Sequence, residues 1–142
     1  MSDFYTALSA AQNKAQYTPA VQSKAEGIDV DTLKVAIDLV LGGDDSASVQ
    51  GAQADALKAG FLFAAELVNM LEKKPTNDEL LKLYGYFKQA NGETLEQPGM
   101  FDLKGKAKYN AWKAINTISA QKAQAEYVTL VSGLVKSYGT QE

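Results

Sequence analysis

The chain has no cysteine, no histidine and no arginine among its 142 residues, and only 3 prolines. The lack of cysteine excludes disulfides and thiol chemistry, and it leaves the redox compartment open. The lack of histidine removes the commonest metal ligand and the usual general base near neutral pH. We therefore expect no metal site and no catalytic site, and the class of enzymes becomes less probable on composition alone.

Long apolar runs are also missing. No apolar stretch reaches the roughly 18 residues of a membrane-spanning helix, so we expect no membrane span. The amino terminus lacks the basic region and apolar run of a secretory signal, and we expect a soluble cytoplasmic protein. A hydrophobic content of 46% with 22% charged residues is ordinary for a globular domain. The length suits one domain, or one small domain with an appendage.

Charge is unevenly divided along the chain, whose net charge is −3. Residues 1–56 hold 3 lysines against 8 Asp and Glu, a net charge of −5. Residues 57–142 hold 11 lysines against 9 Asp and Glu, a net charge of +2. An acidic chain with a local basic part argues against general nucleic-acid binding, which usually needs a basic domain. It permits one small anionic ligand.

Apolar residues recur at helical spacing, and no stretch alternates like a strand. Glycines, prolines and capping residues divide this pattern. We expect helices at residues 4–16, 20–25, 33–41, 50–71, 77–90, 104–115 and 120–138. Thr76 followed by Glu79 forms a capping box, and Asp102 and Ser119 are expected to cap the last two helices. The predicted fold class is all-α.

Two phrases carry most of the chemistry: YGYFKQA at residues 84–90 and PGMFDLKGKAKYNAW at residues 98–112. Tyr84 and Lys88 are four residues apart and share a helix face. In a helix Lys104 and Lys108 would also share a face, whereas Lys106 would point elsewhere. Positive charge near a helix start is unfavourable unless an anion accompanies it. The arrangement suits a ligand with phosphates and a flat ring.

Each of these signals has a plainer interpretation. Tyr84 alone is a reasonable core residue with its hydroxyl at the rim of the core. Lys88 alone is most often a solvated side chain, and a lysine triplet is most often a solvated charge run. The combination of both phrases, in order, favours the ligand-binding interpretation.

The phrases YxxxKQA and PGxxDxKGKAKxxAW are hallmarks of acyl-CoA-binding protein domains, and the chain resembles that family from about residue 57 to residue 139. The resemblance implies an antiparallel four-helix bundle at residues 57–142, with residues 1–56 as an N-terminal helical extension. It also implies non-catalytic binding, sequestration and intracellular transport of medium- and long-chain fatty acyl-CoA esters. The expected protein is a monomer that uses no cofactor and serves acyl-CoA-using enzymes.

The resemblance assigns the coenzyme A site to five residues: Tyr84, Lys88, Lys104, Lys108 and Tyr127. Three apolar residues match positions near the acyl chain and its mouth, although an ordinary core role fits them equally well: Phe61, Ala65 and Leu81. Asn69 stands where the family has a lysine, and the loop between the two phrases is shorter than is common. Lys74 matches a lysine that approaches the ligand, so it is expected to compensate for Asn69.

Two matters stay open at this point. The alternative function is a helical protein-interaction module that uses the acidic residues 1–56 as its partner surface. The extension either gates the basic ligand site or packs as an extra layer against Leu62, Phe63 and Leu67. Packing is the preferred expectation, because the apolar stripe at residues 33–41 needs a partner surface.

Overall fold

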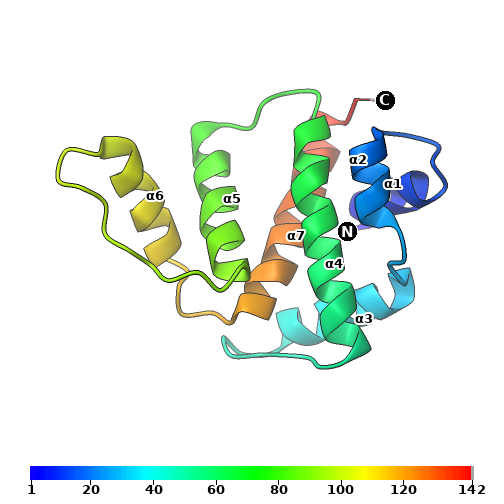
Figure 1. Ribbon diagram of the computed structural model, residues 1–142, viewed down its shortest axis with the longest axis horizontal. Helices are drawn as coiled ribbons and strands as arrows, with labels where there is room; N and C mark the ends of the chain where they lie inside the picture. Colours follow the sequence, from blue (N-terminus) through cyan, green and yellow to red (C-terminus); the bar gives the residue numbers. More distant parts are fainter. Residues whose placement is uncertain (142) are drawn as a thin grey trace.

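The computed structural model describes residues 1–141, which contain seven α-helices and one short 3-10 helix (Figure 1). In chain order these are α1 Ser2–Gln12, α2 Pro19–Ala25, α3 Val30–Gly42, α4 Ala52–Leu67, η1 Val68–Met70, α5 Asn77–Ala90, α6 Leu103–Lys113 and α7 Ala120–Tyr138. Within this described range the only β pairing is an isolated antiparallel bridge between Leu71 and Thr140. The all-α prediction is confirmed.

Side chains cap the starts of the three C-terminal helices as predicted. The Thr76 hydroxyl accepts a hydrogen bond from the Glu79 N–H at 3.2 Å, and the Glu79 carboxylate accepts one from the Thr76 N–H at 2.9 Å. Asp102 caps α6 and Ser119 caps α7, and each accepts a hydrogen bond from an N–H in the first turn of its helix. Each cap satisfies a backbone donor that the helix leaves unpaired.

Two predicted helices end earlier than expected. The helix predicted to reach residue 16 ends at Gln12, because Lys14 and Tyr17 adopt left-handed backbone angles with φ of 54° and 76°. Such angles break a right-handed helix and turn the chain toward α2. The helix predicted for residues 50–71 is α4 up to Leu67, followed by the tighter η1.

Helices α4 to α7 form the four-helix bundle that the resemblance implies. In Figure 1, α4 and α7 run upward while α5 and α6 run downward, so the two pairs are antiparallel. α7 packs against both α4 and α5, and α6 packs against α5 at the outer edge of the bundle. Rings from three helices, Phe61, Phe87 and Tyr127, meet in the core with centroids 5.1 to 6.0 Å apart. This cluster holds α5 in place while leaving its other side free to meet α6.

The N-terminal extension packs against α4 and α7, on the side of the bundle away from α6 (Figure 1). Phe63 and Leu67 of α4 are fully buried there. The Phe4 ring lies edge-on to Phe63 with centroids 5.7 Å apart, and the Phe4 N–H donates to the Ser132 hydroxyl at 3.2 Å. The extension is therefore an added layer of the core, as the packing hypothesis expects, and it lies away from the lysines of α6.

The extension and the bundle share one hydrophobic core. α4 begins at Ala52, so the predicted boundary at residue 57 lies inside a helix that serves both parts. α4 also continues through Gly60 without ending there. A Cβ atom on Gly60 would lie 2.7 Å from Leu33 Cδ1, so this glycine leaves the room that α3 needs to pack on α4.

Candidate functional site

Tyr84 lies at the centre of the candidate site, where α5 faces α6. The Nζ atom of Lys88, from α5, lies 5.7 Å from the centroid of the Tyr84 ring, and that of Lys108, from α6, lies 5.1 Å from it. Trp112 meets the same ring edge-on, with centroids 6.5 Å apart. The structure therefore brings together three of the residues that the sequence assigns to one site.

A close crossing of α5 and α6 produces this arrangement. A Cβ atom on Gly85 would lie 3.0 Å from the Ala111 carbonyl oxygen, so a larger residue would push the two helices apart. The Trp112 indole N–H donates to Gln89 Oε1 at 2.9 Å, and Gln89 Nε2 donates to the Ile118 carbonyl oxygen at 2.6 Å. Gly85 and Gln89 therefore position the site. The sequence alone assigned neither residue a role, although both lie within the first phrase.

An open groove of about 470 Å³ lies between α5 and α6 beside Tyr84. The residues that line it are Asn77, Leu80, Leu81, Tyr84, Lys104, Ala107 and Lys108. The leucines and the alanine supply apolar surface, and the two lysines supply positive charge. Such a lining suits a ligand that has an aliphatic part and an anionic part. Three of these residues were not predicted from the sequence, although each lies one turn from a predicted residue: Asn77, Leu80 and Ala107.

The lysine triplet divides between two sides of α6. Lys104 and Lys108 line the groove, whereas Lys106 lies beside Pro98 and Tyr109 in a different surface depression. This division confirms the prediction from helical spacing. All three lysines are exposed, so their charge is available to a dissolved anion.

A second and more polar pocket, of about 290 Å³, also includes Tyr84 together with Lys88 and Trp112. Glu93, in the loop after α5, lines this pocket, and its Oε1 atom lies 2.9 Å from Lys88 Nζ. The hydrogen bond to Glu93 raises the pKa of Lys88 above its ordinary value. Lys88 is therefore firmly cationic, and an incoming anion has to displace a carboxylate that already pairs with it.

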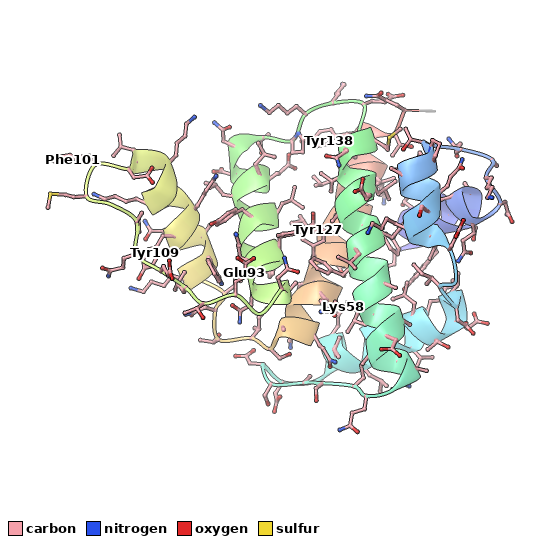
Figure 2. All side chains as sticks on the ribbon, viewed as in Figure 1. Lys58, Glu93, Phe101, Tyr109, Tyr127 and Tyr138 are labelled. Carbon is pink, nitrogen blue, oxygen red and sulfur yellow. The ribbon has the colours of Figure 1, made fainter. Side chains whose placement is uncertain are left out.

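Tyr127 and Phe61 both lie in the core. Figure 2 shows Tyr127 between the bundle helices. The two residues are only 4% and 1% exposed, and their ring centroids are 5.1 Å apart. Burial raises the pKa of Tyr127 to about 12. Both rings pack against Phe87 of α5. Their contact with a ligand stays a prediction.

The remaining predicted residues lie outside the groove. Lys74 is exposed in the loop between η1 and α5, and Ala65 is half-buried on α4. Asn69, in η1, is exposed. Neither Lys74 nor Ala65 lines the groove between α5 and α6, so their roles in ligand binding also stay predictions.

Residues 1–141 contain no group of three or more Asp and Glu side chains placed to hold a metal ion. None of their helices combines the length and the apolar character needed to cross a membrane.

Comparison with known proteins gives a consistent result. The family described as Acyl CoA binding protein matches residues 58–131, more than half of the chain. An acyl-CoA-binding protein homolog of Caenorhabditis elegans is 50% identical over 78 residues, which cover 54% of this chain and 91% of the worm protein. A homolog of Drosophila melanogaster is 49% identical over 80 residues, which cover 55% of this chain and 93% of the fly protein.

A solved structure agrees with the sequence relatives. The crystal structure of Oryza sativa Acyl-CoA-Binding Protein 2 is similar to this chain with a TM-score of 0.54 and 37% identity, and the match covers 57% of this chain and 92% of the rice protein. The family match leaves residues 1–57 outside it. Within the match lie the groove, the polar pocket and both lysine-bearing helices. The chain therefore belongs to the acyl-CoA-binding protein family.

Proposed function

We propose that the chain binds medium- and long-chain fatty acyl-CoA esters in the groove between α5 and α6. One observation carries this proposal: lysines from two different helices converge on Tyr84 beside an apolar groove. The printed names of the related proteins support the same ligand class.

The two halves of such an ester would meet different parts of the site. The lysines hold the phosphates as point charges, and the ring of Tyr84 offers a face on which the adenine can stack. The aliphatic wall of the groove covers the acyl chain. Each buried methylene contributes about 0.8 kcal/mol, so a chain of about twelve carbons outweighs any single lysine. Chain length therefore dominates affinity, and the lysines separate the ester from a free fatty acid.

Binding of this kind fits a carrier that sequesters the ester, shields its acyl chain from water and delivers it to acyl-CoA-using enzymes. We assign no catalytic residue, because the carboxylates of Glu79 and Asp102 cap α5 and α6. The proposed carrier acts as a monomer in the cytoplasm. The alternative, an interaction module on the acidic extension, has no support in the comparisons.

Isothermal titration calorimetry of the full chain with palmitoyl-CoA, free coenzyme A and palmitate tests the proposed function. We expect tight binding of one ester per chain and much weaker binding of either half. A chain that does not bind the ester, or that binds palmitate as tightly, contradicts the proposal.

A bulky side chain in the groove will weaken binding of the acyl chain without weakening binding of coenzyme A. The substitution Ala107→Phe should weaken palmitoyl-CoA binding by roughly tenfold or more, because it displaces several methylenes of the acyl chain. Affinity for free coenzyme A should stay unchanged. Ala107 is exposed, so the fold should tolerate the ring. Ala20→Phe, an equally exposed change in α2, is the matched control, and an equal loss for ester and coenzyme A would show that the acyl chain lies elsewhere.

Removing the carboxylate that pairs with Lys88 will strengthen binding. We expect Glu93→Gln to tighten palmitoyl-CoA binding by roughly twofold to fivefold at low salt, because exposed ion pairs contribute less than about 1 kcal/mol. The gain should shrink as salt screens the charges. Glu26→Gln makes the same charge change in the extension and should leave calorimetric affinity unchanged. Weaker binding by the Glu93 variant would mean that Lys88 does not meet an anion.

A further inference from the structure

The most exposed large apolar side chains of the described residues lie together at the start of α6. Phe101 is 90% exposed, Leu103 78% and Met100 74%, whereas the next is Leu39 at 52%. We call these three residues the apolar tip. Figure 2 shows Phe101 at the outer edge of the molecule, on the loop that enters α6. Three large apolar side chains that are this exposed, within four consecutive residues, mark an interaction surface.

Exposed lysines follow the apolar tip along α6. These are Lys104, Lys106 and Lys108. Asp102, within the same segment, caps α6 by accepting a hydrogen bond from the Gly105 N–H at 2.8 Å. The start of α6 therefore presents three apolar side chains beside three exposed lysines.

We propose that the apolar tip docks the protein on anionic lipid membranes. Met100, Phe101 and Leu103 enter the boundary between headgroups and acyl chains, and the neighbouring lysines meet lipid phosphates and carboxylates. Lipid fits this surface because the three side chains project from a loop and a helix start, and a bilayer accepts projecting groups without a complementary pocket. An anionic bilayer also matches the sign of the exposed lysines that follow the tip.

Docking in this orientation places the groove near the bilayer. Lys104, Ala107 and Lys108 line the groove on the helix that the apolar tip begins. An acyl chain would therefore pass between groove and bilayer over a short path. This second step rests on the proposed function, whereas docking itself does not need the ester.

Flotation of the ligand-free full chain with vesicles tests the docking. Vesicles of equal parts phosphatidylserine and phosphatidylcholine should bind the protein, and vesicles of phosphatidylcholine alone should bind it much less. The double variant Phe101→Ala with Leu103→Ala should lower binding to the anionic vesicles by at least roughly tenfold. Leu39→Ala, at an exposed position on α3, is the control and should bind like the wild type.

Charge is tested separately by Lys106→Gln, which should weaken vesicle binding severalfold, with Lys24→Gln in α2 as its control. Calorimetric affinity for palmitoyl-CoA should be unchanged in these four variants. Failure of the wild type to bind the anionic vesicles, or equal binding by the tip variant and the Leu39 variant, overturns the docking proposal. A wild type that binds the anionic vesicles but does not bind palmitoyl-CoA would overturn the proposed function alone.

Discussion

The double variant Lys88→Ala with Lys108→Ala will bind palmitoyl-CoA at least roughly 100-fold more weakly than the wild type. A hydrogen bond to a charged group contributes about 1.5–3 kcal/mol, and each 1.4 kcal/mol is a factor of ten in affinity. The two lysines reach the Tyr84 ring from different helices, at 5.7 and 5.1 Å. The double variant therefore removes the positive charge that both α5 and α6 bring to Tyr84.

Calorimetry at two salt concentrations measures this effect. The double variant Lys24→Ala with Lys136→Ala removes the same charge from exposed positions on α2 and α7, and it should bind like the wild type. Salt should weaken the wild type more than the site variant, because the site variant has fewer ion pairs to screen. If the site variant binds as tightly as the charge-matched control, these lysines do not hold the phosphates.

Phe4→Ala will lower the free energy of unfolding by about 3–5 kcal/mol, which is the usual cost of removing a buried phenylalanine side chain. Phe4 is fully buried and packs edge-on against Phe63, at the contact between the extension and the bundle. Unfolding in urea, followed by circular dichroism, measures the change. A single transition is expected, because the extension and the bundle share one core.

The matched control is Phe101→Ala, the same substitution at a position that is 90% exposed. It should change the free energy of unfolding by no more than about 0.5 kcal/mol. The Phe4 variant should still bind palmitoyl-CoA normally below its unfolding transition, because the extension lies away from the groove. Tighter binding by this variant would instead support gating by the extension.

Much of the helical framework could be predicted from local signals. Thr76, Asp102 and Ser119 act within their own helix starts, so short-range chemistry is enough to place them. The early end of α1 could not be predicted, because the left-handed angles of Lys14 and Tyr17 depend on how the following segment packs. Gly60 likewise has a role only once Leu33 of α3 is known to lie against it.

The residues of the candidate site also divide into those that local spacing predicts and those that depend on the tertiary fold. Helical spacing places Lys104 and Lys108 on one face, and the structure agrees. Glu93 was missed because its contact with Lys88 joins a loop to a helix and depends on the path of that loop. Phe61 and Tyr127 were assigned by resemblance, and spacing along a helix cannot tell a core ring from one that reaches a ligand.

Amide chemical shifts of the isotopically labelled full chain, recorded during titration with palmitoyl-CoA, show which residues the ester contacts. We expect the largest changes on α5 and α6 around Tyr84, Ala107 and Lys108, and little change in α1 to α3. Changes centred on the extension, or no changes with the ester in excess, would contradict a site that joins the lysines to the apolar groove.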